Sequence, residues 1–530
     1  MLIAFHFPRR CWPLVILLLL LLAQPAPTPA HAQGPCGTVD AIDYPLDPAQ
    51  FSIVYRFGMP STRFDGRYHA GEDWFGTRTA TYGAPVRAIA RGRVTYAAPF
   101  GWGRDKGVVI IEHTFPDGTL WYSLYGHMEE VEPYTFPAVY TCVERGEIIG
   151  AIGRPRPAPH LHLEIRNFWP DSPGPGYWAT DPTLSGWRRP SKFIENWQAW
   201  FNPAHRWHGD LTDESGPQWP DILREDGALV VYDDGRLKAL NPTGQVLWRY
   251  ILSEDLNVVG VLPYQGDILV ADYDGVMQRW SMEGGFIEAW QLPHAVNSTP
   301  ITWGDLLIVH TPDDELIAYG PDRTERWRVP DVPRPVTMQV TARLLGVASV
   351  RGAVTFVGID GTVASRAMLR ERGDLAPAPG DGFYLRSRYS LWYVMPDGTW
   401  RWLADSPATT RGTAALHSLP DGRFVVYSGR SERTLYAYDM AGRQQWAVTL
   451  PDFQGRPFIL PIGDALLLAD GYGHTAAVGA ESGALCNQMH VWGNRGAAAR
   501  AVPGPDGVLR LHIADQVIGL DWTIFAAGCR

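Results

Sequence analysis

Charged residues and long apolar runs are both scarce in this sequence. Only 19% of its 530 residues are Asp, Glu, Lys or Arg, and the formal net charge is −10 at pH 7. A negative chain is repelled by phosphate backbones, so nucleic acid is not expected as the main partner. Beyond the N-terminal stretch, no segment reaches the roughly 18 consecutive apolar residues of a membrane helix. We therefore expect no membrane span in the mature chain.

The first 32 residues have the layout of a signal for export. They contain two neighbouring arginines, an apolar stretch over residues 12–22 and the small-residue sequence Ala-His-Ala at residues 30–32. This order predicts a cleavable secretory signal peptide, with an uncleaved anchor as the alternative. The mature protein is then expected to be secreted, either outside the cell or into the periplasm and cell envelope.

Cysteine is also rare, with five in the whole chain. Removal of residues 1–32 takes away Cys11 and leaves Cys36, Cys142, Cys486 and Cys529. An even number of cysteines suits the oxidising compartments that exported proteins reach. Of the three pairings that four cysteines allow, clustering along the chain favours Cys36 with Cys142 and Cys486 with Cys529.

Turn-forming residues are plentiful, with 55 Gly and 44 Pro, and they point to a mostly β protein. From residue 219 to residue 530 one pattern repeats: a Gly/Asp turn, two apolar strands, a Gly turn and often a tryptophan. The repeat averages about 40 residues, the size of a four-stranded propeller blade. We predict a seven- or eight-bladed β-propeller whose equivalent units end at Trp248, Trp290, Trp327, Trp402 and Trp446.

The repeat ending "NPTGQVLW" resembles those of quinoprotein-dehydrogenase-like propellers. Each closing tryptophan is expected to dock one blade on the next. A dehydrogenase activity does not follow, because this half has no adjacent cysteine pair and no obvious quinone or calcium constellation. The propeller is therefore expected to target the protein or bind a partner whose identity the sequence does not give.

The N-terminal half has a different organisation. Residues 33–50 form a lead segment, and residues 51–185 alternate apolar and polar positions between Gly turns, which predicts a compact antiparallel β domain. Residues 186–218 are expected to be a linker with one short helix, "SKFIENWQAWF", capped by Ser191. The fold class is thus an antiparallel β domain followed by a β-propeller.

Three short pieces of this β domain carry the candidate ligands. They are "RYHAGEDWFG" with His69 and Asp73, "LYGHMEE" with His127, and "PHLHLEIR" with His160 and His162. His69 and Asp73 lie an even number of residues apart, so both can face one side of a strand or of a helical turn. One histidine of the H-x-H pair would then complete a set of three metal ligands, two nitrogens and one oxygen. Such a set leaves a zinc position open for water, as catalytic sites do. The other two histidines can then orient or deprotonate that water and stabilise an oxyanion.

Together with "ERGEIIGAIG" and the following "DPT", these pieces resemble, in order and spacing, the lysostaphin/LytM-type zinc endopeptidases of peptidoglycan. The resemblance implies that His69, Asp73 and His162 bind zinc, while His127 and His160 form the catalytic pair. The spacing alone does not tell which histidine of the H-x-H pair is the ligand. No H-E-x-x-H helix occurs in the chain.

Two neighbours of these motifs are expected to be outside the chemistry. His113 matches a structural strand position of the family. Glu72 adjoins a ligand and is expected to be an exposed neighbour, with hydrogen bonding to the ligand as the alternative.

Two departures from the family pattern are expected to border the substrate groove. The loop "IGRPRPAPHLH" carries Arg154 and Arg156 where small residues are usual, and the segment "EEVEPYTFPAVYTCVERGE" is longer than usual. Both are expected to change substrate preference without removing a site residue. Whether residues 33–50 cover the groove stays open.

The resemblance predicts an exported zinc metalloendopeptidase that hydrolyses peptide bonds in peptidoglycan cross-links, with Zn²⁺ as cofactor. The alternatives are a non-hydrolytic binding or regulatory protein of the envelope and a protease that acts on a protein substrate.

Overall fold

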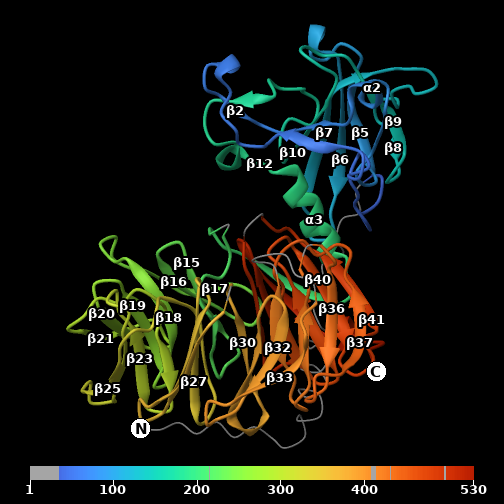
Figure 1. Ribbon diagram of the computed structural model, residues 1–530. Coiled ribbons are helices and arrows are strands. Elements are labelled where there is room, and N and C mark those ends of the chain that lie inside the picture. Colours follow the sequence, from blue (N-terminus) through green and yellow to red (C-terminus); the bar gives the residue numbers. More distant parts are fainter. Residues whose placement is uncertain are drawn as a thin grey trace, which may run out of the picture. The chain divides into compact units, whose positions relative to one another are not determined.

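The computed structural model describes residues 35–529 apart from residues 214, 370, 408–413, 430 and 495–496. The predicted signal peptide and Cys11 lie outside these residues. The chain divides into two compact units, Met1–Ile194 and Glu195–Arg530, each described here by itself (Figure 1). Within the described residues, no helix has the length and apolar character needed to cross a membrane.

The first unit is built on one large sheet and a separate two-stranded ribbon. Its strands are β1 (Ser52–Tyr55), β2 (Tyr68–His69), β3 (Glu72–Phe75), β4 (Pro85–Arg87), β5 (Gly92–Ala98), β6 (Gly107–Thr114), β7 (Leu120–Glu129), β8 (Cys142–Val143), β9 (Ile148–Ile152), β10 (Leu161–Arg166), β11 (Tyr177–Trp178) and β12 (Trp187–Arg188). The large sheet has the order β1-β3-β10-β7-β6-β5-β8, with β12 beside β10 and with β9 pairing β4 and β7. Strands β2 and β11 form the ribbon. The pairs are antiparallel, as predicted.

The centre of this sheet is buried because apolar side chains alternate on β6 and β7. Val108 and Ile110 on β6 pack with Tyr122 and Leu124 on β7 in one cluster. Burying each such side chain contributes about 1.5–3 kcal/mol relative to leaving it in water. This rigid centre supports the strands that carry the motif histidines.

The lead segment packs along the first unit and is tied to it covalently. Cys36 and Cys142 form a disulfide, which confirms the predicted pairing. The backbone N–H of Val39 donates to the carbonyl of Thr114 at 2.8 Å, next to the end of β6. Val39 is buried, so this segment adds to the core of the unit.

Helices are few and short among the described residues. The α-helices there are α2 (Arg78–Thr81), α3 (Pro190–Trp200) and α4 (Trp522–Phe525), and the 3-10 turns are η1 (Thr62–Phe64), η2 (Gly103–Asp105), η3 (Pro182–Ser185) and η4 (Pro379–Asp381). Helix α3 contains the predicted "SKFIENWQAWF", and the boundary between the two units falls within it.

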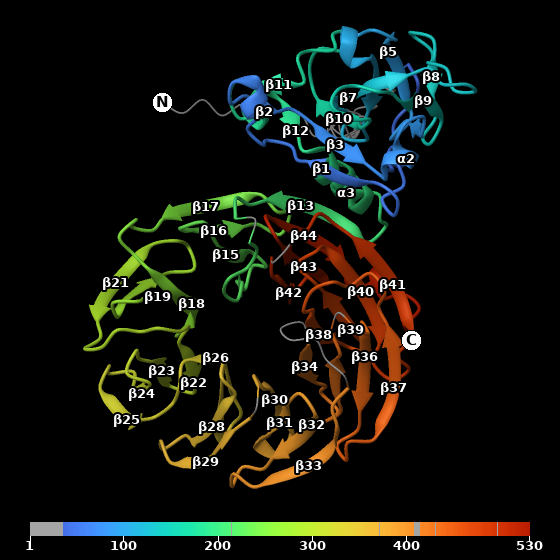
Figure 2. The same cartoon turned by 45° about the horizontal axis from the view of Figure 1, so that its top comes forward.

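The second unit is a ring of four-stranded antiparallel sheets (Figure 2). The first four blades are β14 (Ile222–Leu223), β15 (Leu229–Asp233), β16 (Arg236–Leu240), β17 (Val246–Ile251); β18 (Val258–Tyr264), β19 (Asp267–Asp272), β20 (Val276–Trp280), β21 (Phe286–Gln291); β22 (Ile301–Trp303), β23 (Leu306–His310), β24 (Leu316–Tyr319), β25 (Glu325–Val329); and β26 (Pro335–Val340), β27 (Leu344–Ser349), β28 (Ala353–Gly358), β29 (Val363–Met368). The next three are β30 (Asp374–Ala378), β31 (Gly382–Arg386), β32 (Ser390–Val394), β33 (Trp400–Asp405); β34 (Ala415–Ser418), β35 (Phe424–Tyr427), β36 (Thr434–Tyr438), β37 (Gln444–Thr449); and β38 (Phe458–Ile462), β39 (Ala465–Ala469), β40 (His474–Gly479), β41 (Leu485–His490).

The last blade joins the two ends of the second unit. Strand β13 (His205–Asp210) pairs with β44 (Gln516–Asp521), which continues to β43 (Val508–Ile513) and β42 (Ala499–Pro503). The described residues thus form eight blades. This confirms the predicted propeller and shows that the number of blades is eight, one of the two numbers predicted. The disulfide between Cys486 and Cys529 is also confirmed.

The repeated tryptophans pack between blades, as predicted. Trp248 lies against the turn at Gly284 in the next blade, where an added side-chain carbon would stand 2.7 Å from the indole. Trp446 lies in the same way against Gly483, and its indole N–H donates to the carbonyl of Ala480 at 3.2 Å. A glycine in each turn therefore makes room for the tryptophan of the preceding blade.

Trp402 is the exception. It is 53% exposed, and its neighbour Leu403 occupies the position against Gly442 in the next blade. The prediction that Trp402 docks the blades is therefore wrong. The outer strand bulges at the residue before the tryptophan in the blades of Trp248 and Trp446. In β33 the bulge lies at Leu403, after Trp402, and this shift turns the tryptophan outward.

Candidate metal centre

Strands β2, β3 and β10 bring together His69, Asp73 and His162. His69 ends β2, and the register of β3 with β10 places Asp73 directly opposite His162. Between β2 and β3, a side-chain carbon on Gly71 would stand 2.3 Å from the carbonyl oxygen of Leu163 and 2.7 Å from Nε2 of His162. Only glycine fits there, and this explains the small residue within "HAGED".

The three side chains place one donor atom each at the corners of a small triangle. Nε2 of His69 lies 3.0 Å from Nδ1 of His162 and 3.2 Å from Oδ1 of Asp73. Nδ1 of His162 lies 3.0 Å from the same carboxylate oxygen. Donors about 2.0–2.1 Å from a tetrahedral zinc ion stand about 3.3 Å apart. The triangle is therefore close to the size that a metal ion of this kind requires, and these residues form a candidate metal site.

Hydrogen bonds on the far side of each imidazole fix which nitrogen faces the triangle. Nδ1 of His69 lies 3.2 Å from the carbonyl oxygen of Arg56, so it carries the proton and donates. Nε2 of His162 lies 3.0 Å from a carboxylate oxygen of Glu164 and donates to it. The facing nitrogens of His69 and His162 then both present lone pairs, which a cation or a proton must separate. The donor set thus fits a divalent metal ion.

The charges of the three side chains also favour a bound cation. Burial opposes ionisation of Asp73, but hydrogen bonds from His162 and His69 outweigh it and lower the pKa of the carboxyl. Burial lowers the pKa of His162, yet its hydrogen bonds to Asp73 and Glu164 dominate and raise it to about 9. Burial lowers the pKa of His69. The position between the donors therefore attracts positive charge strongly.

Glu164 is the functional neighbour that sequence reasoning missed. It is buried, its second carboxylate oxygen accepts from the indole N–H of Trp187 at 2.9 Å, and Arg166 lies 3.3 Å away. Burial raises the pKa of Glu164, but His162 and Arg166 lower it overall, so the group is an anion. A carboxylate that orients a ligand imidazole is typical of metal sites. The available signal was its position two residues after His162 on the same strand face.

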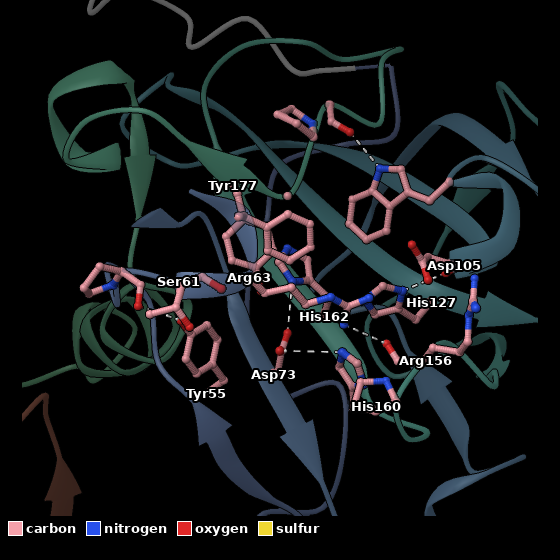
Figure 3. A pocket seen from close by; sticks show the side chains of 18 residues that line it. Tyr55, Ser61, Arg63, Asp73, Asp105, His127, Arg156, His160, His162 and Tyr177 are labelled. Atoms are coloured by element: carbon pink, nitrogen blue, oxygen red, sulfur yellow. Dashed lines mark hydrogen bonds and ion pairs between the residues drawn. The ribbon is translucent and has the colours of Figure 1, made fainter. Parts of the chain in front are cut away.

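His127 and His160 stand beside Asp73 and His162 (Figure 3). Their rings are 4.5 Å apart between centroids, and Nε2 of His160 lies 3.6 Å from the second oxygen of Asp73. Nδ1 of His127 donates to the carbonyl of Asp105 at 2.7 Å, and Nδ1 of His160 donates to that of Ala158 at 2.8 Å. Nδ1 of each histidine therefore carries a proton on the far side, and Nε2 of His160 points toward Asp73.

The protonation state of His127 follows from its surroundings. Burial, together with the nearby His160 and His162, lowers its pKa to about 3. Its backbone φ of 64° lies in the left-handed region, a strained conformation that occurs often at functional sites. His127 is therefore a neutral proton acceptor at neutral pH.

A pocket of about 570 Å³ opens beside these side chains (Figure 3). Tyr55, Trp102 and Tyr177 give it aromatic walls, and Arg63 and Arg156 give it positive charge. The guanidinium of Arg63 donates to the backbone carbonyl of Arg156 at 3.3 Å, so the two loops that carry these arginines meet at the pocket. Polar and charged side chains, among them Asp73, His127 and His160, line the pocket alongside these aromatic rings.

The loop before β10 borders this pocket only in part. Arg156 lines the pocket, as predicted, whereas Arg154 stacks on Tyr82, 3.9 Å from the ring centroid, and does not line it. The long segment 129–147 supplies no lining residue in the described part of the chain, so the prediction for that segment is wrong. Its Phe136 instead packs against Gly107 and Gly150 of the sheet. The described lead segment, residues 35–50, supplies no lining residue either.

The expectation that Glu72 is exposed is wrong. It is only 2% exposed, and its two carboxylate oxygens accept from the backbone N–H of Ser191 at 3.0 Å and the hydroxyl of Ser191 at 2.7 Å. Ser191 lies inside helix α3, and its hydroxyl serves this carboxylate, so the expected capping role is also wrong. Burial raises the pKa of Glu72 to about 7.

His113 is buried away from the pocket, in agreement with its predicted structural role. Its Nδ1 lies 2.8 Å from the carbonyl of Arg91, and its Nε2 lies 2.7 Å from the hydroxyl of Ser123. Burial lowers its pKa to about 4.

Fold and site together define a chain with a β domain that carries a two-histidine, one-carboxylate metal site and with an eight-bladed β-propeller. Residues 67–173 match the family model described as Peptidase family M23. This match confirms the peptidase resemblance predicted from the histidine motifs. Residues 204–330 and 233–358 match the model described as Outer membrane protein assembly factor BamB.

Individual relatives resemble the propeller half. The Outer membrane protein assembly factor BamB of Nitrosomonas eutropha is 34% identical over 140 residues, which make up 26% of this chain and 33% of the relative. The chain thus matches about a third of that relative's length. The crystal structure of BamB from Moraxella catarrhalis shares 15% identity with a TM-score of 0.46, covering 60% of this chain and 97% of that one. Sqt1 of Saccharomyces cerevisiae shares 11% identity with a TM-score of 0.47, covering 60% and 98%.

Proposed function

We propose that the protein is an exported zinc metalloendopeptidase that hydrolyses peptide bonds in peptidoglycan cross-links. The observation that carries this proposal is the triangle of His69, Asp73 and His162 with two further imidazoles beside it on the pocket side. The match of residues 67–173 to Peptidase family M23 supports the peptidase part. Two disulfides suit an oxidising compartment and support export.

In this proposal Nε2 of His69, Nδ1 of His162 and Oδ1 of Asp73 hold the zinc ion. Zinc in such a site supplies Lewis acidity, which polarises a carbonyl and makes water a better nucleophile at neutral pH. Glu164 and the carbonyl of Arg56 keep the two ligand imidazoles in the required tautomers. No cysteine takes part in the donor set.

His127 and His160 are the proposed acid–base pair. Nε2 of each is unprotonated, because Nδ1 of each is committed to a backbone carbonyl. Either nitrogen can take a proton from the attacking water, and the imidazolium so formed can stabilise the oxyanion or donate to the leaving amine. Positioned acid–base groups of this kind contribute about 10²–10⁴-fold to a rate.

The proposed propeller role is targeting or partner binding. The similarity of residues 204–358 to the model described as Outer membrane protein assembly factor BamB favours a protein partner in the envelope. The presence of all five proposed site residues argues against a non-hydrolytic regulatory protein. A protein substrate is the remaining alternative, because Arg156 at the pocket departs from the small residues of the family.

The deciding experiment measures zinc content and wall hydrolysis together. We expect about one zinc ion per chain in the parent protein, loss of zinc in His69→Ala and Asp73→Ala, and release of new peptide ends from purified walls only by the parent. Walls with several cross-link types should be used. Bound zinc without new peptide ends from any of them would refute the peptidoglycan substrate and leave peptidase activity on protein substrates to be assayed.

A further inference from the structure

The innermost strands of the propeller blades all start at the same end of the ring. In each blade the first strand of the sequence repeat lies nearest the ring centre (Figure 2), and rotation about the axis carries one inner strand onto the next without reversing it. Arg372 and Arg456 stand two residues before the inner strands β30 and β38, and Arg500 is the second residue of the inner strand β42. Three blades therefore present an arginine at this end.

A carboxylate and a fourth arginine link two of these positions. The guanidinium of Arg386 donates through Nε to Asp374 at 2.9 Å, and Nη2 of Arg456 lies 3.0 Å from the other oxygen of the same carboxylate. Arg372 is close enough to be repelled by Arg456 and by Arg386. Asp374 is thus already shared between two guanidinium groups before Arg372 is considered.

Arg372 shares the charge of Asp374 with these two guanidinium groups. Its Nε is buried and makes no hydrogen bond within the described part of the chain. Burial, and then repulsion by Arg456, lower its pKa. Asp374 attracts Arg372 and opposes this effect, but the pKa stays lowered overall. A half-buried cation that shares its counter-ion with two other guanidinium groups costs free energy.

Arg500 extends the group on the other side of Arg456. Its guanidinium lies over the ring of Phe458, 5.5 Å from the centroid, and it interacts with Asp221 and is repelled by Arg456. Asp221 is already bonded by Nδ1 of His512 at 3.0 Å. Within the described part of the chain, four arginines therefore share two carboxylates, and one of these, Asp221, also bonds His512.

We propose that this end of the inner propeller surface binds an oxyanion, a phosphate or carboxylate group, through Arg372, Arg456 and Arg500. Planar guanidinium groups match both anions with paired hydrogen bonds. The bound group would supply the acceptor that Nε of Arg372 lacks and would neutralise the excess positive charge. This site is independent of the proposed peptidase activity, because none of its residues belongs to the first unit.

The test titrates the full chain with inorganic pyrophosphate and, separately, with succinate, by calorimetry at constant ionic strength. The protein is first treated with a chelator, so that neither anion can bind to a metal ion in the first unit. We expect one of the two anions to bind with a stoichiometry of one. Its Kd should rise at least tenfold in Arg372→Gln and in Arg456→Gln and stay unchanged in Arg249→Gln, which alters an exposed arginine on the outer strand β17. Binding of pyrophosphate would identify the ligand group as a phosphate, and binding of succinate would identify it as a carboxylate.

Arg372→Gln is the deciding variant, because Arg456→Gln also breaks the contact with Asp374 and can weaken the fold. Without anion, the Tm of Arg372→Gln should equal or exceed that of the parent, since a repelled cation is removed. The inference is overturned if neither anion binds, or if either binds the parent and Arg372→Gln equally. It is also overturned if the Tm of Arg372→Gln without anion is below that of the parent, since that result would show that Arg372 stabilises the fold.

Discussion

Glu164 accepts a hydrogen bond of 3.0 Å from Nε2 of His162, on the opposite side of the ring from the nitrogen that faces Asp73. The carboxylate therefore selects the tautomer in which Nδ1 of His162 is free for a metal ion. Glu164 is held in turn by Trp187 and Arg166, so it cannot turn away from the imidazole without breaking these contacts.

Replacing Glu164 by Gln is expected to weaken metal binding. The neutral amide makes His162 a poorer donor, and loss of such an orienting carboxylate typically costs 10–100-fold in metal affinity. Competition with a chromophoric zinc chelator measures the change. Glu112→Gln is the matched control, because Glu112 pairs with Arg93 and does not line the pocket. Equal affinities in the two variants would remove Glu164 from the metal site.

Alanine at His127 or at His160 should abolish most of the activity while leaving the metal bound. We expect kcat to fall by about 10²–10⁴ in each variant, since a positioned acid–base group is lost. Zinc content should stay at the parent value, because neither nitrogen belongs to the donor triangle. If either variant loses zinc in proportion to activity, that histidine is a ligand.

Arg156→Ser is expected to change substrate preference. The arginine lines the pocket, where its positive charge is expected to favour peptides with a carboxylate near the scissile bond. The ratio of kcat/KM for a cross-link peptide with a free carboxylate to that for a neutral glycine-bridged peptide should fall several-fold, in keeping with an exposed charge pair worth about 0.2–1 kcal/mol. Arg154→Ser is the control, because Arg154 stacks on Tyr82 outside the pocket. An equal change in both variants would contradict the assignment.

His113 is expected to make the first unit sensitive to mild acid. Its pKa is about 4 in the folded state and about 6.5 in an unfolded chain, so folding favours the neutral ring. The stabilisation is fully present above pH 6.5 and is lost as the pH falls toward 4, by an amount on the order of 3 kcal/mol. Hydrogen exchange of the β6 and β7 amides, corrected for intrinsic rates, measures this loss.

His113→Gln should flatten that pH dependence, since glutamine does not titrate. The amides of a propeller strand such as β35 serve as the internal reference in the same samples. An unchanged pH profile for β6 and β7 in His113→Gln would show that another group controls the acid sensitivity.

The two histidines of "PHLHLEIR" illustrate what the sequence predicts well. Side chains two residues apart on a strand share a face, and the structure has His160, His162 and Glu164 in contact on one side of β10 and the turn before it. Local periodicity is sufficient there, because neighbours on one strand face are also neighbours in space. The role of each residue still required the resemblance to a family.

Glu72 shows where local reasoning fails. Its burial depends on Ser191, which is 119 residues away in the sequence, and no pattern around Glu72 announces that partner. The prediction for Trp402 fails for a different reason. The bulge of the outer strand lies after this tryptophan, not before it as in the blades of Trp248 and Trp446, so Leu403 takes the docking position. The number of blades was open because β13 comes from a segment without the repeat signature.

The pairing of β13 with β44 also governs when the propeller can form. Arg206 on β13 bonds Asp521, 315 residues further along the chain, at 2.7 Å. During synthesis β13 emerges early and must wait for the final strand before its blade exists. The Cys36–Cys142 loop is complete long before that moment, so the first unit can reach its folded form while the ring is still open. A nascent chain stopped shortly before β44 would therefore carry a folded first unit and an unclosed propeller.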